Sequence, residues 1–349
     1  MKNLILSKHI FIFLFIVNIL FYFFRFISEH IGGDEVVAYV SLMPFLHALI
    51  DGKFLPTFLV FFHEPIFLIV QFPMMFFEAS GFFVRLPSLI FGILYFVVLY
   101  KLGGLIFGKK SIYTFCLILL YMVSAYFRIL RAELNHGLFN LIMAVSLYYL
   151  IKFDQKRKIE DFYRAYKLLL LNFFVYIDAV FSGIGLIFVM LYAKIKKNQV
   201  INRNLITPTF IGLFVFCIWS AGVFFGSTIS DAYNWQLQAP FSLISRGGSY
   251  SLTAVTSNLD LFSSNTSLEY LLFIFIFLVI SVFDKRSRPV WALLIVPLVY
   301  FNLVKMPTVH MFNFLTLILV AVVSGLRTLI EHFPKIKYIV LIFFGIAIF

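Results

Sequence analysis

Long apolar runs separated by short polar segments make up most of the sequence. A helix needs about 20 apolar residues to cross a bilayer. Several of these runs are close to that length. The clear candidates for spanning helices are residues 10–27, 84–102, 112–129, 137–153, 207–225, 268–283, 289–304 and 310–327. A short apolar tail, 337–349, follows them. This pattern predicts an all-α polytopic membrane protein.

The composition agrees with a membrane protein and excludes soluble classes. Hydrophobic residues make up 62% of the chain and charged residues 13%, whereas soluble domains are about half apolar and about a quarter charged. Cys116 and Cys217 both lie inside apolar runs, which gives neither a disulfide framework nor a zinc spacing. The net charge of +12 is ordinary for a membrane protein with cationic cytoplasmic loops, and no motif indicates nucleic-acid binding.

Charge decides how the ambiguous run 65–79 is placed. The first run has no small-x-small cleavage site before Arg25, so we read it as an uncleaved span with a cytoplasmic N-terminus. If 65–79 lies along the membrane surface, three quarters of the 28 Lys and Arg residues fall on the cytoplasmic side. If it crosses, three quarters fall outside. The positive-inside rule favours the surface placement.

The run 168–193 lies between two basic clusters that both belong inside, so it must enter the membrane and return. At about 1.5 Å per residue it reaches about 39 Å, which is too short for two crossings of a core about 30 Å thick. We expect two short helices that turn near 177–178. The predicted total is about eleven membrane helices, two of them short, with surface-lying helices in the first extracytoplasmic loop.

Most of the 16 acidic residues fall on the extracytoplasmic side of this topology. Acidic residues do not set topology, so their gathering there calls for another explanation. In the first outer loop, Gly32-Gly33 precede Asp34 and Glu35. Asp34 is either an N-cap with Glu35 in the first helical turn, or one of the two carboxylates is a general base. The residues leave both open.

Three further outer segments carry candidate chemistry. His63 and Glu64 precede Pro65, and a carboxylate beside so apolar a helix is either interfacial or kept for function. Arg128 and Arg131 share a helix face and suit phosphate oxygens, although pairing with Glu133 or lipid contact would also explain them; Asn135 follows closely. Lys305 and His310 offer a second anion contact on the same side.

The 226–267 outer loop is long enough to suggest a functional or mobile segment. Its Tyr233 and Trp235 could stack on a sugar or lie in the interfacial aromatic belt.

Taken in order, several of these pieces resemble GT-C glycosyltransferases of the protein O-mannosyltransferase and lipid A aminoarabinose transferase type. The resemblance covers residues 20–155 most strongly. It is carried by GGDEVVAY, DGKFLP, HEP, FVRLPSLIFGIL, LGGLIFGKK and YFRILRAELNHGLFNLIMAVSLYYL, with a weaker match in MPTVHMFNFLTLIL.

The resemblance implies a hexosyl or pentosyl transferase that uses a polyprenyl-phosphate-linked sugar and inverts the anomeric centre. It implies Asp34 as general base, with Glu35 beside it, and Arg128, Arg131, Lys305 and His310 at the donor phosphate. His63, Glu64, Glu133, Asn135, Tyr233 and Trp235 would line the cavity or contact the acceptor, which is a lipid, a glycan or a protein. A divalent cation, if one is needed, would bind Asp34 and Glu64.

The expected organisation is a catalytic module over 1–155, followed by the remaining membrane helices over 156–349 with the 226–267 loop and no separate soluble domain. The Phe-rich and Ile/Lys-leaning composition suggests a bacterial cytoplasmic (inner) membrane in the cell envelope, with the active site on the extracytoplasmic face. Two rival functions stay open: a multi-span lipid or glycan transporter or flippase, and an O-antigen ligase or polymerase. A transporter would be expected to keep paired repeats and ionisable groups near the midplane.

Overall fold

The computed structural model describes residues 8–28, 81–109, 111–123, 134–173, 207–211, 268–303, 313–338 and 340–341, together with the single residues 175, 179, 182, 183, 185 and 187. In this part of the chain every regular element is a helix. Three helical stretches in it are long and apolar enough to cross a membrane: Leu86–Gly108, Gly137–Lys156 and Leu315–His332. The predicted helical membrane architecture is therefore supported, while the predicted total of about eleven helices depends on residues outside the described ranges.

The helices follow the predicted apolar runs closely in most cases. The elements are α1 (Lys8–Ser28), α5 (Gly81–Gly103), the π-helical turn η2 (Gly104–Gly108), α6 (Ile112–Val123), α8 (Leu134–Lys156), α9 (Ile159–Phe173), α14 (Leu268–Ser281), the 3₁₀ turn η4 (Lys285–Ser287), α15 (Arg288–Leu303), α17 (Leu315–His332) and the 3₁₀ turn η5 (Pro334–Ile336).

Ring contacts and hydrogen bonds fix the direction of each helix against its neighbours. The Phe11 and Tyr100 rings lie 4.0 Å apart, which sets the beginning of α1 against the end of α5 and makes the pair antiparallel. The Ser146 hydroxyl donates to the Ala165 carbonyl at 2.8 Å, and α8 and α9 are joined by a two-residue connection, so they too are antiparallel. By contrast, α8 and α5 run in the same direction, because Gln155 near the end of α8 reaches the Leu105 carbonyl just after α5.

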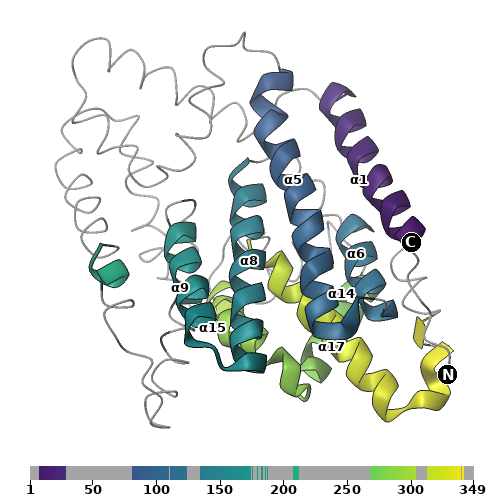
Figure 1. Ribbon diagram of the computed structural model, residues 1–349. Helices are drawn as coiled ribbons and strands as arrows, with labels where there is room; N and C mark the ends of the chain where they lie inside the picture. The colour runs from purple at the N-terminus through teal and green to yellow at the C-terminus, as the bar shows by residue number, and fades with distance from the viewer. Residues whose placement is uncertain are drawn as a thin grey trace, which may run out of the picture.

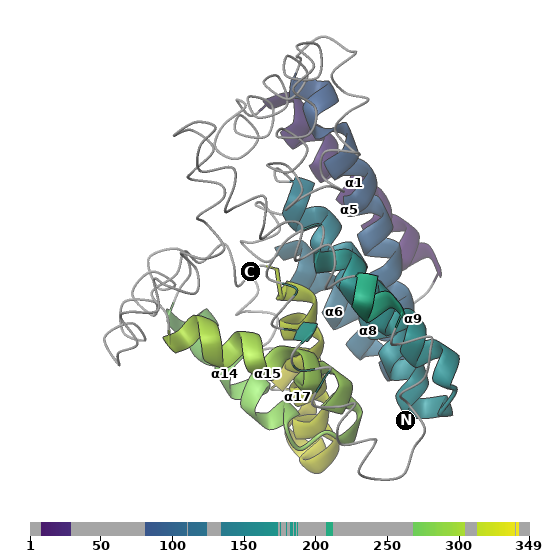
Figure 2. The same cartoon turned by 90° about the vertical axis from the view of Figure 1, so that its left-hand side faces the viewer.

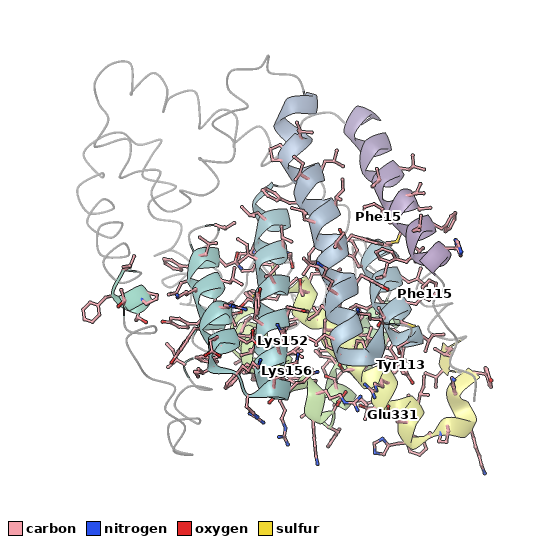
Figure 3. All side chains as sticks on the ribbon, in the orientation of Figure 1. Phe15, Tyr113, Phe115, Lys152, Lys156 and Glu331 are labelled. Carbon is pink, nitrogen blue, oxygen red and sulfur yellow. The ribbon has the colours of Figure 1, made fainter. Side chains whose placement is uncertain are left out.

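These directions bring the polar connections to one end of the bundle, as Figure 1 shows. There α5, α8, α14 and α17 end, and α1, α6, α9 and α15 begin. Four of the basic segments predicted to lie together, 101–109, 152–167, 285–288 and 327–337, are gathered there, with Lys152 and Lys156 visible in Figure 3. The segment 194–203 lies outside the described residues. We call this the basic end, and the opposite one the far end. Helix α1 ends and α5 begins at the far end. Residues 65–79 lie outside the described part, so their surface placement stays a prediction.

One predicted boundary was wrong in the run 168–193, because α9 begins at Ile159, nine residues earlier than expected. The helix is amphipathic: it buries Phe162 and Leu169 while Arg164 and Lys167 stay exposed, so it can begin inside the basic segment. After α9 the Val175 N–H donates to the Asn172 carbonyl in a turn, and the predicted return near 177–178 lies outside the described residues. Beyond it, the Ser182 hydroxyl donates to the Leu293 carbonyl of α15 at 3.1 Å.

A second boundary was displaced at the last predicted span. We expected a helix over 310–327, but α17 runs from Leu315 to His332. Arg327 does not end the helix, because its guanidinium pairs with Glu331 one turn later at 2.7 Å. Pro334, which follows at the start of η5, is the residue type that cannot continue a helix.

Helix α17 joins two groups of helices that Figure 2 shows from the side. It is buried along nearly all of its length and packs against α14, α15, α6 and α8. It approaches α14 closely at Gly325, where a Cβ would meet the Phe277 carbonyl. Small residues of this kind allow membrane helices to pack backbone to backbone.

We predict that Gly325→Ala destabilises the protein by about 1–3 kcal/mol, because the added methyl group forces α14 away from α17. Thermal unfolding in detergent micelles measures the effect. Gly183→Ala is the matched control, since a Cβ at Gly183 has no neighbouring atom within 4 Å. Equal unfolding temperatures for the two variants would show that the α14–α17 contact tolerates a side chain.

Candidate functional site

Nearly all of the residues predicted to form the active site lie outside the part of the chain that the structure describes. These are Asp34, Glu35, His63, Glu64, Arg128, Arg131, Glu133, Tyr233, Trp235, Lys305 and His310. Asn135 is the exception, as the second residue of α8. Their roles stay predictions, and so does the division of the chain at residue 155.

The described helices nevertheless define where the segments carrying these residues connect. Helix α1 ends at Ser28, and α5, α8, α14 and α17 begin at Gly81, Leu134, Leu268 and Leu315. Each of these termini is the end of its helix that points away from the basic end, and α17 begins beside Tyr95, part-way along α5. The segments that follow α1 or lead into α5, α8, α14 and α17 therefore join the bundle on one side.

A fully buried polar cluster joins three helices towards this far end. The Tyr95 hydroxyl on α5 and the Thr316 hydroxyl on α17 lie 2.7 Å apart. The Thr316 hydroxyl is also 3.3 Å from the Asn140 side-chain oxygen on α8, and the Thr316 N–H donates to that same oxygen at 3.4 Å. We call Tyr95, Asn140 and Thr316 the far-end polar cluster.

Asn140 stabilises the beginning of α17 from a different helix. The first N–H groups of any helix have no partner within that helix, and Phe314, at the position before α17, has no side-chain oxygen to cap them. Asn140 supplies an oxygen to the Thr316 N–H, and both residues are fully buried. In a membrane interior a backbone group must be satisfied by protein, because water is absent.

Aromatic packing surrounds the far-end polar cluster. The Phe139 and Phe314 rings meet edge to face at 5.9 Å between centroids, and the Tyr95 and Tyr121 rings do so at 4.9 Å. The cluster therefore lies in a packed region that includes α6 as well. Sequence reasoning missed these residues, although Asn140 and Thr316 do interrupt apolar runs and could have been noticed as buried polar positions.

At the basic end, η2 receives hydrogen bonds from three other helices. Its carbonyl oxygens accept side-chain hydrogen bonds from Thr114 of α6 (to Gly108, 2.9 Å), Gln155 of α8 (to Leu105, 3.3 Å) and Arg327 of α17 (to Ile106, 3.4 Å). The Gly108 carbonyl also accepts from the Ser111 N–H at 3.0 Å. Gly108 has a φ of +96°, a conformation that favours glycine. The turn thus ties the ends of α5, α8 and α17 to the start of α6.

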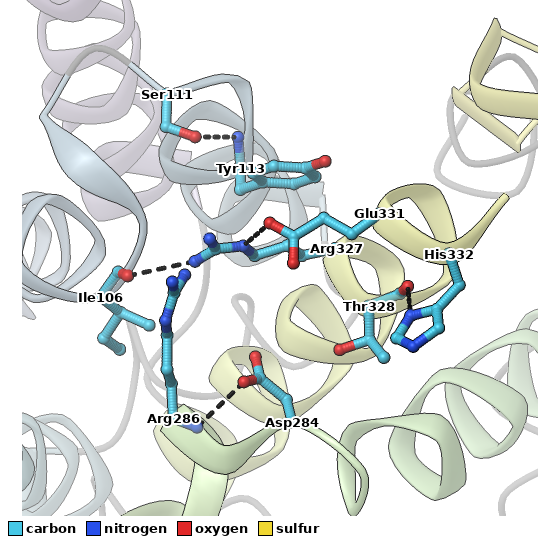
Figure 4. Close-up of polar contacts among 9 residues, drawn as sticks. All are labelled: Ile106, Ser111, Tyr113, Asp284, Arg286, Arg327, Thr328, Glu331 and His332. Carbon is cyan, nitrogen blue, oxygen red and sulfur yellow. Dashed lines mark hydrogen bonds and ion pairs between the residues drawn. The ribbon is translucent and has the colours of Figure 1, made fainter. Parts of the chain in front are cut away.

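Charged groups complete the basic-end network that Figure 4 shows. Arg327 pairs with Glu331 and lies 5.9 Å from the centre of the Tyr113 ring. Asp284 accepts a hydrogen bond from the Arg286 backbone N–H at 2.9 Å. Burial raises the pKa of Asp284, nearby Arg327 lowers it and Glu331 raises it. This arrangement fixes helix ends.

A second set of charges joins α8 to α9 at the same end. The buried Asp161 carboxylate lies 3.6 Å from both Lys152 and Arg164, and Lys152 also lies over the ring of Tyr149. These partners explain how an acidic residue is tolerated on the buried side of α9. Within the described residues, no group of three or more His, Cys, Asp and Glu side chains is arranged to hold a metal ion.

We predict that Asp284→Asn raises the unfolding temperature by a few degrees at pH 7, with a smaller gain at pH 4. Asparagine keeps an oxygen that can accept the Arg286 N–H, but it carries no charge. Because the pKa of Asp284 is raised by folding, its ionisation costs stability, and the cost grows as pH rises from the unfolded value of about 3.9 through the folded one. Thermal unfolding at both pH values, with Asp154→Asn on the α8–α9 side as control, tests this. A lower unfolding temperature at pH 7 would mean that Asp284 stabilises as a charged partner of Arg327.

Comparison with known proteins gives one match. The model of the dolichyl-phosphate-mannose-protein mannosyltransferase family matches residues 65–221. No curated protein and no solved structure matches the chain. The match includes Arg128, Arg131, Glu133 and Asn135. It begins after Asp34, Glu35, His63 and Glu64 and continues beyond residue 155, so its extent differs from the predicted resemblance over 20–155. Over residues 65–221 the chain is therefore similar to a family of membrane glycosyltransferases of the GT-C type.

Proposed function

We propose that this protein is an integral-membrane glycosyltransferase that moves a sugar from a polyprenyl-phosphate donor to an acceptor hydroxyl, with inversion at the anomeric carbon. The family match over residues 65–221 carries the proposal. The helical architecture and the candidate membrane spans agree with it. We further propose that the protein resides in the cytoplasmic membrane and that the reaction takes place on its extracytoplasmic face.

The far end of the bundle is our candidate for that face. The segments that carry Asp34, Arg131 and His310 connect to helix termini at this end. The basic end, by contrast, gathers cationic segments, as cytoplasmic loops do. These two observations support an active site on the side away from the positive charge.

The acceptor hydroxyl is a poor nucleophile, so it is the reactant that most needs activation. In our proposal Asp34 accepts its proton while the hydroxyl oxygen bonds to the anomeric carbon, with Glu35 beside it. The bond from that carbon to the phosphate oxygen breaks, and polyprenyl phosphate leaves with its electron pair. An acid catalyst is dispensable because the phosphate is already a good leaving group.

Cations stabilise the additional charge that develops on the departing phosphate. Arg128 and Arg131 can share a phosphate through their planar guanidinium groups, and Lys305 and His310 supply positive charge from a distant part of the sequence. We assign His63, Glu64, Glu133, Asn135, Tyr233 and Trp235 to the cavity and the acceptor. A divalent cation, if one takes part, would bind Asp34 and Glu64.

We predict that Asp34→Asn lowers transfer by about 100-fold or more, the usual contribution of a positioned base. Asparagine caps a helix as well as aspartate does, so a purely structural Asp34 would leave activity nearly intact. Mass spectrometry of polyprenyl-phosphate sugars in membranes measures the outcome. One lipid-linked sugar should accumulate only with the mutant, which would also identify the donor. Identical lipid pools for wild type, Asp34→Asn and the control Asp154→Asn would contradict the proposal and favour a transporter.

We predict that Arg131→Ala mainly weakens use of the donor, raising its KM about tenfold or more, because a charge-assisted hydrogen bond to the phosphate is lost. Initial rates against donor concentration, in detergent or liposomes, give the KM. Arg157→Ala, at an exposed position on the basic end, is the control. A KM unchanged by Arg131→Ala would remove this residue from the phosphate site.

A further inference from the structure

The far-end polar cluster joins the two parts of the chain that carry the proposed phosphate-binding cations. Asn140 lies in the second turn of α8, and Thr316 is the second residue of α17. They are 176 positions apart in the sequence, yet the Thr316 N–H donates to the Asn140 side-chain oxygen at 3.4 Å. The Thr316 hydroxyl lies 3.3 Å from that oxygen and 3.4 Å from the Asn140 carbonyl oxygen, and it can donate to either. Contacts so far apart in sequence hold α8 and α17 in one register.

Each of these helices continues directly from a cationic segment. Arg131 comes three residues before Leu134, where α8 begins, and Arg128 three before that. His310 comes five residues before Leu315, where α17 begins, and Lys305 five before that. A shift of α17 along α8 would therefore displace the origin of one cationic segment relative to the other.

The contacts of the cluster are suited to holding this register. The Thr316 hydroxyl can accept a hydrogen bond from Tyr95 while it donates to Asn140, so one oxygen joins three helices. All three side chains are buried, and hydrogen bonds that water cannot replace are directional constraints that a shifted helix would break. The edge-to-face pair of Phe139 and Phe314 lies directly beside them.

We propose that Tyr95, Asn140 and Thr316 are positioning residues for donor binding: they fix the start of α17 against α8, so that Arg128 and Arg131 on one segment and Lys305 and His310 on the other bind the same donor phosphate. This inference rests on the proposed function. It adds that the phosphate site is assembled from two distant segments, and that its geometry is set inside the bundle by side chains that do not touch the donor.

The test uses substitutions that remove the hydrogen bonds of the Thr316 hydroxyl and keep the shape of the side chain. Thr316→Val replaces the hydroxyl with a methyl group, and Thr316→Ser restores the hydroxyl. We expect Thr316→Val to raise the donor KM about tenfold, since small displacements of binding groups weaken their joint action, and Thr316→Ser to return it to within about twofold of wild type. Tyr95→Phe should act in the same direction as Thr316→Val.

Ser146→Ala is the matched control. Ser146 lies on the same helix as Asn140, is equally buried, and donates to the Ala165 carbonyl of α9 at 2.8 Å. The substitution removes a bond between helices of the same kind on the side of α8 that faces α9. We expect it to lower the unfolding temperature and to leave the donor KM unchanged. A KM that rises equally with Ser146→Ala would show that any loss of packing has this effect, and would overturn the proposal.

A double-mutant cycle separates positioning from general stability. When Arg131→Ala has already removed a phosphate contact, Thr316→Val should have little further effect on the donor KM. The position of Arg131 relative to Lys305 and His310 then no longer contributes to binding of the phosphate. Effects on KM that multiply independently would overturn the positioning role. The wild type separates failure of the proposed function from failure of the positioning role. If the wild type transfers no sugar from any lipid-linked donor, the proposed function fails and this inference fails with it. Transfer by the wild type with independent effects overturns this inference alone.

Discussion

The first N–H groups of α17 have no partner of their own in an environment without water, and this constraint organises the far end of the bundle. A soluble protein could leave such groups to solvent or to a local Ser or Asp cap. Here Phe314 precedes the helix, and the oxygen comes from Asn140 of α8. Helix α17 therefore depends on α8 for its beginning, and Tyr95 brings α5 into the same contact.

At the basic end the backbone groups are acceptors and the side chains are donors. Carbonyl oxygens of the π-helical turn η2 accept hydrogen bonds from Thr114, Gln155 and Arg327. Each end of the bundle is thus joined by side chains that complete another element's backbone hydrogen bonds. Between the two ends the helices are held by close packing, as where α14 approaches Gly325.

Hydrogen bonds at both ends of the bundle and close packing between them suit the proposed reaction. A glycosyltransferase that acts on a lipid-linked donor must hold charged groups at the edge of an apolar bundle. The buried contacts between helices fix the points from which the segments beyond the helix ends begin. The family match covers residues 65–221, whereas Thr316 and the segment before it lie outside that range. In our proposal both regions are needed for one phosphate site, and the described contacts show how their attached helices are joined.

The sequence by itself determined the class of protein and the path of most helices. Runs of apolar residues must be buried in lipid or protein, and the uneven distribution of Lys and Arg predicted which connections share an end; the directions of α1, α5, α8 and α9 agree. It did not determine where α9 begins. Charged residues such as Arg164 and Lys167 are typical of a loop, and only the structure shows that the residues between them form the buried face of a helix. Nor did the sequence show that Asn140 and Thr316 meet, since an isolated polar residue in an apolar run has no visible partner. Only the tertiary structure decided that pairing, because a hydrogen bond between positions 176 residues apart depends on how whole helices pack.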